Sequence, residues 1–335
     1  MTNRKIPVGQ AGIANHGRTI INAIRDSGNL QLVSCFDINA AAQGQVAREF
    51  GASTKSGFDE LVNDPAIEAI SLVTPNQLHQ EEVEKAVKAG KHIFVEKPIG
   101  NTVAEGKAML EAVKGSGLVF MVGHNTRRRQ VFRRAKEILN QKEIGNVVAV
   151  EANLSRPAGL QPGLPAWKAD RRTCPLLPMM QLGIHLVDTV EFLLGHVAKV
   201  SCFATNIAMQ NGALDSTSSI LQLESGIPVS LSSYYVSADA YFLRVYGTKG
   251  TIHCTPTKLR LEKLENGEFK EAIDEDFSNE GAGSYIKQMQ EFGDCILNGR
   301  KPETGGEEAL RALAAIEAMV RSVEHQTVVA LNEIL

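Results

Sequence analysis

One segment near the start of the chain indicates the architecture: Ile6-Pro7-Val8-Gly9-Gln10-Ala11-Gly12-Ile13-Ala14-Asn15. A short apolar run leads directly into a turn made of glycine and alanine, and an amphipathic segment follows it. This order of strand, tight turn and helix is typical of a dinucleotide-binding unit, whose backbone approaches a pyrophosphate at the helix N-terminus. We match the glycine fingerprint of such units to Gly9, Ala11 and Ala14, with Gly12 and Ile13 between them as further cofactor contacts.

Two features of this segment leave its interpretation open. Alanine adds a methyl group, which the helix-packing position tolerates better than the position beside a phosphate, and such a turn can also be purely structural. Pro7 is awkward in a central strand because proline cannot donate a ladder hydrogen bond. We expect either a shorter strand or a bulge just ahead of the glycine turn.

Asp37 strengthens the cofactor interpretation. It ends the apolar run Leu30–Phe36, 25 residues beyond Gly12, where a carboxylate would accept hydrogen bonds from a ribose 2′-hydroxyl. The same carboxylate would repel a 2′-phosphate, and residues 38–40 supply no basic side chain. NAD is therefore expected rather than NADP. In the alternative interpretation, Asp37 only caps a helix that starts near Ala40.

The first 123 residues alternate apolar runs with amphipathic ones, which predicts an α/β Rossmann domain with a doubly wound parallel sheet. The expected strands are Ile6–Val8, Leu30–Phe36, Ile67–Val73, His92–Val95 and Val119–Val122. The expected helices are Thr19–Ser27, Ala40–Phe50, Gln80–Ala89 and Val103–Lys114.

Residues 124–335 have a different pattern, in which strands follow one another and helices are segregated. This pattern predicts an α+β domain with a large, mostly antiparallel sheet. The expected strands are Val147–Asn153, Val200–Ala208, Ser218–Leu223, Pro228–Tyr235, Phe242–Tyr246, Thr251–Cys254 and Lys258–Leu264, with Asn266-Gly267 among the turns. The expected helices are Gln130–Asn140, Ile184–Leu194, Tyr285–Leu297 and Glu307–Val323.

Composition excludes several classes of function. A chain of 335 residues with 43% hydrophobic residues and a net charge of −3 suits a two-domain globular protein rather than a nucleic-acid binder. No apolar run approaches the roughly 18 residues that cross a membrane, and the first residues lack a secretion signal. The five scattered cysteines show neither metal-ligand spacing nor a disulfide framework. A cytoplasmic protein without a metal site is expected.

Two later segments carry a family resemblance: Ile70–His79, ending in Thr-Pro-Asn-Gln-Leu-His, and Gly90–Pro98, ending in Val-Glu-Lys-Pro. They closely resemble the Gfo/Idh/MocA family, which includes glucose–fructose oxidoreductases and inositol dehydrogenases. The resemblance continues nearly to the end of the chain, at residues 123–127, 182–188, 247–251, 290–292 and 307–310.

The resemblance implies a set of roles. It places Thr74, Pro75 and Asn76 on the nicotinamide side of the cofactor, and Glu96 and Lys97 near the ribose and the substrate. His79 is expected as a further cofactor contact. His185 would lie beside the reacting carbon. The peptide bond before Pro98 is often cis in such proteins.

The chemistry of these side chains agrees with that assignment. Oxidation of a secondary alcohol needs a hydride acceptor and a group that removes the hydroxyl proton. A histidine such as His185 titrates near neutral pH and can take that proton. Lys97 can stabilise the developing alkoxide and relay the proton. The structural alternatives are a locally satisfied histidine at a helix start and a lysine at an exposed strand end.

Other candidates contact the substrate in this interpretation: Asn125, Arg127, Trp167, Gln181 and His185. Gln181 departs from many relatives, which carry an acidic residue at that position, so a carboxylate that would tune Lys97 and His185 is missing. Trp167 could stack on a sugar or fill a hydrophobic gap. Asp188 could orient His185 or be structural, and the basic run that contains Arg127 could be a solvated helix start.

The sequence thus predicts an NAD-linked dehydrogenase that acts on a secondary hydroxyl of a sugar, cyclitol or related polyol. Two alternatives stay open: an enzyme that retains NAD and cleaves glycosides, and a regulator that senses dinucleotides without catalysis. A homodimer or homotetramer through the C-terminal sheet is expected, because strands Ser218–Leu223 and Pro228–Tyr235 alternate apolar residues that a partner could bury.

Overall fold

The computed structural model describes residues 4–335, which form two compact units. The first unit contains the chain up to Asn125 together with Ala282–Leu310, and the second contains Thr126–Gly281 and Arg311–Leu335. Residues 282–310 had been assigned to the second domain by the sequence analysis. They lie in the first unit because helix α9 (Gly283–Asn298) packs on helix α1 (His16–Asp26).

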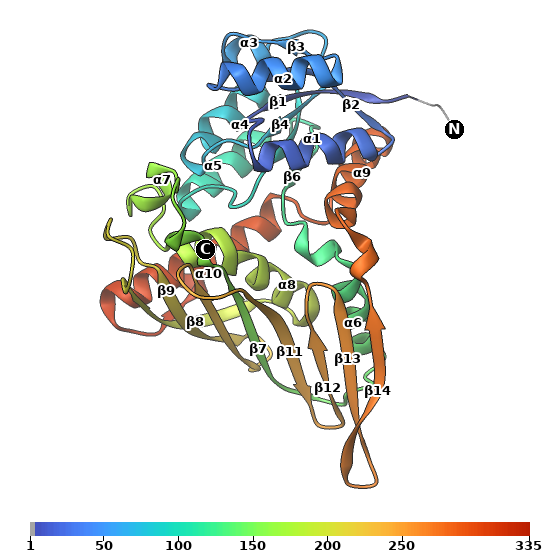
Figure 1. Ribbon diagram of the computed structural model, residues 1–335, viewed down its shortest axis with the longest axis vertical. Helices are drawn as coiled ribbons and strands as arrows, with labels where there is room; N and C mark the ends of the chain where they lie inside the picture. Colours follow the sequence, from blue (N-terminus) through green and yellow to red (C-terminus); the bar gives the residue numbers. More distant parts are fainter. Residues whose placement is uncertain (1–3) are drawn as a thin grey trace. The chain divides into compact units, whose positions relative to one another are not determined.

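The first unit is built on a six-stranded sheet in the order β3-β2-β1-β4-β5-β6, in which all neighbouring strands run parallel (Figure 1). The strands are β1 Ile6–Ala11, β2 Leu30–Phe36, β3 Ser53–Thr54, β4 Ala69–Leu72, β5 His92–Val95 and β6 Phe120–Val122. The predicted doubly wound α/β sheet is confirmed. Of the six strands of this sheet, the two-residue strand β3 is the one that was not predicted.

Helices of the first unit cover this sheet. They are α1 His16–Asp26, α2 Ala40–Phe50, α3 Phe58–Val62, α4 His79–Lys88, α5 Val103–Val113 and α9 Gly283–Asn298. An apolar core joins α1 and α9 to the sheet, with Ile20 and Ile24 from α1 and Phe292 from α9 fully buried in it. The ring of Phe292 lies 6.0 Å from that of Phe94 on β5.

Pro7 lies within β1, and the strand accommodates it as predicted. The pairing of β1 with β2 shifts register between Val8 and Gly9, so a bulge precedes the glycine turn. The carbonyl oxygen of Pro7 still accepts a hydrogen bond from the amide of Glu68 at 2.9 Å. The proline therefore removes one donor from the ladder without ending the strand.

The second unit is built on a nine-stranded sheet in the order β14-β13-β12-β11-β7-β10-β9-β8-β15. The strands are β7 Val147–Ser155, β8 Val197–Thr205, β9 Ser216–Leu223, β10 Pro228–Tyr234, β11 Ala240–Gly247, β12 Gly250–Cys254, β13 Lys258–Glu265, β14 Glu268–Asp276 and β15 Val329–Ala330. Strands β7 and β10 pair in parallel, and the other neighbours are antiparallel. The predicted mostly antiparallel sheet is confirmed.

Four helices accompany this sheet: α6 Gln130–Asn140, α7 Ala166–Ala169, α8 Ile184–Leu194 and α10 Gly306–His325. The alternating apolar residues of β9 and β10, including Leu221 and Leu231, are fully buried within the chain itself. They therefore do not need a partner subunit, and this reason for expecting an oligomer was wrong. The opposite face of the same strands carries Ser218, Ser230 and the exposed Ile220.

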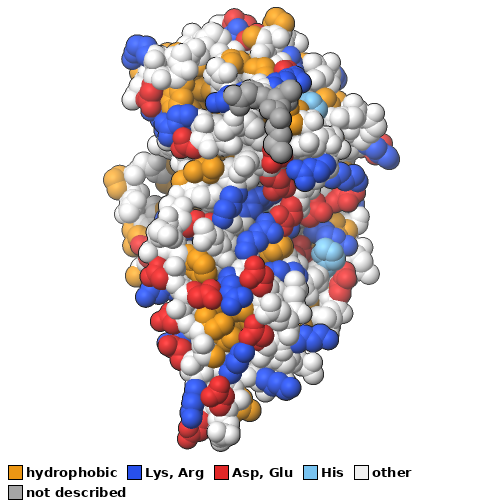
Figure 2. Space-filling model, turned by 90° about the vertical axis from the view of Figure 1, so that its right-hand side faces the viewer, with side chains coloured by type: hydrophobic (Ala, Val, Ile, Leu, Met, Phe, Trp, Pro, Cys, Tyr) orange, Lys and Arg blue, Asp and Glu red, His pale blue; other side chains and the backbone are white. Residues whose placement is uncertain are grey.

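The surface carries no field of a single charge sign on the side that Figure 2 displays, where acidic and basic side chains are interspersed. Between residues 4 and 335, none of the helices has both the length and the apolar character needed to cross a membrane. Within the same range all five cysteines are buried free thiols.

Candidate active site

The turn after β1 lies three residues later than predicted. Gly9 and Ala11 are buried within β1, so they are strand residues and the predicted fingerprint register was wrong. The chain turns at Gly12, which has φ of +77°, and a Cβ there would lie 2.2 Å from the carbonyl oxygen of Val73. At Gly17 a Cβ would lie 2.2 Å from the carbonyl oxygen of Gly12. The fingerprint is therefore Gly12-x-Ala14-x-x-Gly17, and Gly17 is the residue that the sequence analysis missed.

Gln10 holds this turn from inside the sheet. Its buried side-chain Nε2 donates to the carbonyl oxygens of Gly12 and Gly17, both at 2.9 Å. Asn15, which precedes α1, has φ of 47° and ψ of −108°. Residues other than glycine adopt this backbone conformation at a cost of about 1–3 kcal/mol. The turn is thus fixed at both ends and strained between them. Ala14 and Asn15 are exposed, so their backbone is accessible to a ligand.

Asp37 connects the end of β2 to the same turn. Its Oδ2 accepts hydrogen bonds from the amides of Ile13 at 2.8 Å and Ala14 at 3.3 Å, and its Oδ1 accepts one from Asn39 at 2.8 Å. The N-cap of α2 is Asn39, whose side chain accepts from the amide of Ala42. Asp37 is therefore not the helix cap that the structural alternative required. It lies next to Ile38, whose side chain is 95% exposed.

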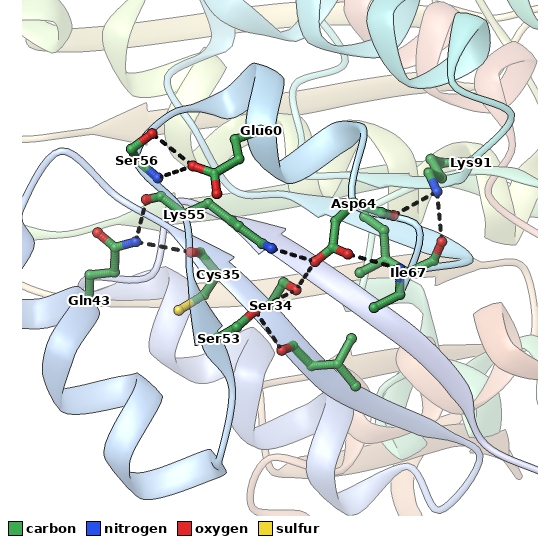
Figure 3. Close-up of polar contacts among 12 residues, drawn as sticks. Ser34, Cys35, Gln43, Ser53, Lys55, Ser56, Glu60, Asp64, Ile67 and Lys91 are labelled. Carbon is green, nitrogen blue, oxygen red and sulfur yellow. Dashed lines mark hydrogen bonds and ion pairs between the residues drawn. The ribbon is translucent and has the colours of Figure 1, made fainter.

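A polar network joins β2 to α2 and to the two segments that flank α3 (Figure 3). The side chain of Gln43 on α2 donates to the carbonyl oxygens of Cys35 at 3.0 Å and Lys55 at 2.7 Å. The buried carboxylate of Asp64 accepts a hydrogen bond from Ser34 at 2.5 Å and forms an ion pair with Lys55 at 2.9 Å. The hydrogen bond from Ser34 outweighs burial and, with Lys55, lowers the pKa of Asp64 to about 2.

The loop after β4 is held by hydrogen bonds of two polar side chains, Thr74 and Asn76. Thr74 donates from its hydroxyl to Glu82 Oε2 at 2.5 Å. Burial raises the pKa of Glu82 to about 7, although the hydrogen bond from Thr74 acts in the opposite direction. Asn76 is buried and donates to Asn101 Oδ1 at 3.1 Å. Thr74 and Pro75 are half-buried, as residues that line a site would be.

His79, one of the predicted cofactor contacts, is a buried residue whose ring contacts backbone carbonyl oxygens. It is 1% exposed, with Nδ1 3.1 Å from the carbonyl oxygen of Pro98 and Nε2 3.1 Å from that of Thr74. Burial lowers the pKa of His79, although the hydrogen bonds to these carbonyl oxygens act in the opposite direction. The ring joins the loop after β4 to the loop after β5, so we interpret His79 as a brace rather than a cofactor ligand.

Glu96 and Lys97 follow β5 directly, and the Lys97–Pro98 peptide is cis, as the resemblance implied. The amide of Lys97 donates to Glu96 Oε2 at 3.1 Å, and His16 Nε2 lies 3.2 Å from Glu96 Oε1. Burial favours the neutral acid, but His16 and Lys97 outweigh it, so the pKa of Glu96 is lowered. Lys97 itself is half-buried.

In the second unit, a π-helical segment, Met179–Gly183, leads into α8. Such segments occur frequently at functional sites. His185 is half-buried, and its Nδ1 lies 3.1 Å from the hydroxyl oxygen of Thr126. Thr189 donates from its hydroxyl to the carbonyl oxygen of His185 at 2.7 Å. These contacts fix the start of α8 and the orientation of the imidazole.

Two predicted substrate residues are engaged in internal contacts. The buried guanidinium of Arg127 donates to both carboxylate oxygens of Asp188, at 2.6 and 3.0 Å, and this pair fits the structural interpretation of Asp188. Arg127 is therefore not part of a solvated basic surface. In the first unit, the buried Asn125 donates to Ser284 Oγ on α9 at 3.0 Å.

Two other candidates are half-buried side chains of the second unit. Gln181 lies within the π-helical segment, with Nε2 3.9 Å from the sulfur of Cys174. Trp167 lies on the short helix α7, and Lys168 Nζ lies 5.3 Å from the centre of its ring.

The structure brings the cofactor candidates of the first unit together at one edge. Parallel strands end at the same edge of a sheet, and β1, β2, β4 and β5 are followed by Gly12, Asp37, Thr74 and Glu96 respectively. This is where a dinucleotide binds on such sheets, and the glycine positions and the carboxylate fit one. Lys97 belongs to this unit, whereas His185 belongs to the second.

Comparison with known proteins agrees with this geometry. Residues 6–124 match the family model described as an oxidoreductase family with an NAD-binding Rossmann fold, and residues 136–331 match the C-terminal alpha/beta domain of that oxidoreductase family. The chain belongs to the Gfo/Idh/MocA oxidoreductase family. The resemblance is therefore confirmed. It was carried by two segments, Thr74-Pro75-Asn76 and Glu96-Lys97-Pro98.

Individual members of the Gfo/Idh/MocA family resemble the chain along most of its length. It is 26% identical to 1,5-anhydro-D-fructose reductase of Ensifer adhaerens, covering 90% of this chain and 91% of that protein. It is 27% identical to inositol 2-dehydrogenase of Rhizobium meliloti, covering 94% and 96%. A crystal structure of a Desulfitobacterium hafniense protein superposes with a TM-score of 0.92 at 26% identity, covering 99% of both chains.

Proposed function

We propose that this Gfo/Idh/MocA protein transfers a hydride between a secondary hydroxyl of a sugar, cyclitol or related polyol and a nicotinamide dinucleotide. The observation that carries the proposal is the convergence of Gly12, Asp37, Thr74 and Glu96 at the carboxyl edge of the parallel sheet, with Lys97 next in sequence. The reductase and inositol dehydrogenase relatives support a carbohydrate-like substrate.

The chain's own residues would supply binding and proton transfer, and a bound nicotinamide would supply the hydride acceptor or donor. The turn from Gly12 to Gly17 would hold the pyrophosphate, because the amides at the start of α1 point to it. His185 Nδ1 faces Thr126, so we assign Nε2 to take the hydroxyl proton. Lys97 would stabilise the alkoxide while that proton leaves.

We infer a preference for NAD over NADP from the end of β2. The carboxylate of Asp37 lies against the amides of Ile13 and Ala14, within the turn that would hold the dinucleotide. A 2′-phosphate would meet this negative charge, and Ile38 and Asn39 offer no positive charge in return. The exposed side chain of Ile38 offers an apolar surface instead.

The relatives named above give no support to a glycoside-cleaving enzyme or a non-catalytic regulator. We further propose that the protein is a homodimer or homotetramer through the nine-stranded sheet. Its support is the open face of β8 and β9, where Phe203 is 77% exposed and Ile220 is 54% exposed among small serines. A cytoplasmic location remains a prediction.

The function is tested by measuring reduction of NAD and NADP with a panel of polyols, for the wild type and for His185→Ala, Asp37→Ala and His325→Ala. His185→Ala should lower turnover by roughly 10²–10⁴-fold without changing the Kd for NADH, because it removes only the base. Asp37→Ala should reduce the preference for NAD. The exposed His325 is the control, and its replacement should change neither quantity.

Turnover of His185→Ala that equals the wild-type value would exclude His185 as the base. An unchanged preference in Asp37→Ala would exclude the ribose assignment. If no polyol is oxidised with either cofactor although the dinucleotides bind, the proposed dehydrogenase activity is wrong.

A further inference from the structure

His16 is a residue that neither the sequence motifs nor the family resemblance singled out. It is the first residue of α1 and directly follows the strained Asn15 in the dinucleotide turn. Its side chain is 43% exposed, and its Nε2 lies 3.2 Å from Oε1 of Glu96, whose side chain is only 6% exposed. On its other side the imidazole meets the ring of Tyr285 edge-on, with the ring centres 5.7 Å apart. The imidazole therefore has a defined place between α1, α9 and the end of β5.

Glu96 is confined to its position. A Cβ on Gly123 would lie 2.8–2.9 Å from the carboxyl carbon and both oxygens of Glu96, so the carboxylate occupies the space that a side chain at 123 would need. Its Oε2 is fixed by the amide of Lys97. A buried carboxylate without a compensating charge is unfavourable by several kcal/mol. His16 is the group that meets its other oxygen.

The position of His16 beside Glu96 affects how a dinucleotide can bind, so the inference rests on the proposed function. A pyrophosphate binds where helix amides and the helix dipole favour negative charge, which is the start of α1. His16 occupies that start, and Glu96 places a buried negative charge directly beside it. Lys97 compensates part of this charge, and without His16 the remainder would repel the anion that the turn must accept.

We propose that His16 is a positioning residue that neutralises Glu96 at the start of α1 and so allows an anionic dinucleotide to bind beside a buried carboxylate. The role is electrostatic and belongs to this pair of residues. It differs from a packing role against Tyr285, because a packing role requires a ring and not a charge.

A double-mutant cycle tests this proposal through the Kd for NADH, measured by fluorescence titration at about pH 6. The four proteins are the wild type, His16→Phe, Glu96→Gln and the double variant. His16→Phe keeps a ring beside Tyr285 and should weaken NADH binding by roughly tenfold, because Lys97 alone then compensates the charge of Glu96. In the Glu96→Gln background the same replacement should change the Kd by less than about twofold.

His16→Lys provides a second, independent variant. It removes the ring but keeps a positive charge, so it should bind NADH within about threefold of the wild type, and at about pH 8 it should bind more tightly than His16→Phe. Thermal unfolding of each variant shows that it is folded. The Kd then reports an effect that packing alone would not produce.

Equal effects of His16→Phe in the two backgrounds would overturn the proposal, since the loss would not depend on Glu96. A His16→Lys variant as weak as His16→Phe would also overturn it and would favour packing against Tyr285. Absence of NADH binding by the wild type would overturn the proposed function and this inference with it.

Discussion

At the scale of single residues, the site depends on side chains that are buried beneath the loops rather than exposed in them. Gln10 holds both ends of the dinucleotide turn, and His79 joins the loops after β4 and β5 through their carbonyl oxygens. Glu82 acts in the same way on Thr74. These residues fix the backbone that a cofactor would contact. The conformation of the loops therefore depends on these buried side chains as much as on the exposed ones.

Glu82 gives a prediction at this scale. Because its pKa is raised to about 7 in the folded protein, ionising it disfavours folding, and stability should fall as pH rises from about 4.5 to about 7. Glu82→Gln still accepts the Thr74 hydroxyl and has no charge to bury. It should therefore raise the unfolding free energy by about 2 kcal/mol at about pH 8, and by much less at about pH 4.5.

Urea denaturation at the two pH values measures this difference, with Glu81→Gln as the control. Glu81 is the neighbouring carboxylate, with a side chain that is 70% exposed, and its replacement should change stability by no more than about 0.5 kcal/mol. A Glu82→Gln protein that is less stable than the wild type at about pH 8 would show that the ionised carboxylate is favourable.

At the scale of secondary-structure elements, the network of Asp64, Ser34 and Lys55 ties β2 to the two segments that flank α3. The pKa of Asp64 is depressed to about 2, so its contribution to stability is present above about pH 4 and is lost as pH falls toward 2. Asp64→Asn should therefore lower the unfolding free energy by about 2 kcal/mol at about pH 7. The difference from the wild type should shrink toward about pH 3.

The same denaturation experiment on Asp59→Asn is the matched control, because Asp59 lies on α3 with a side chain that is 73% exposed. It should behave like the wild type at both pH values. A constant difference between Asp64→Asn and the wild type across the pH range would mean that the network contributes through shape and not through charge.

Most elements could be predicted from the sequence, because apolar runs and glycine turns mark them directly. Strand β14 was missed because its residues, Glu268–Asp276, are mostly polar and exposed, and its few apolar residues do not alternate. The Asn266-Gly267 turn before it was predicted, and both residues have positive φ. The turn of the cofactor site was misplaced because Gly9 looked like a fingerprint glycine. The spacing from Gly12 to Gly17 was the available signal.

Some of the site could not be read from the sequence at all. His16 meets Glu96 across 80 residues of chain, and Asn125 meets Ser284 across 159, so only the folded chain shows these pairs. Arg127 looked like part of an exposed basic run, but it is buried against Asp188. Residue type indicated the chemistry of Lys97, His185 and Asp37, whereas the neighbours that orient them depend on tertiary structure.

At the scale of the whole molecule, the open face of the nine-stranded sheet gives a prediction about assembly. Exposed apolar side chains on a flat sheet face are typical of an interface, and Phe203 and Ile220 lie on neighbouring strands. Phe203→Glu with Ile220→Glu should shift a dimer or tetramer toward the monomer in light scattering. Leu78→Glu, the replacement of an exposed leucine in the first unit, is the control and should leave the mass unchanged. A monomeric wild type would contradict the proposed interface.

The proposed hydride transfer is tested most directly by following the hydrogen itself. A polyol that the enzyme oxidises, labelled with deuterium at the reacting carbon, is incubated with unlabelled NAD, and the reduced cofactor is analysed by mass spectrometry. We predict one deuterium in each reduced nicotinamide and none in the water, because the hydride passes directly between the two carbon atoms. Reduced cofactor without deuterium, or bound NAD that no polyol reduces, would contradict the proposed function.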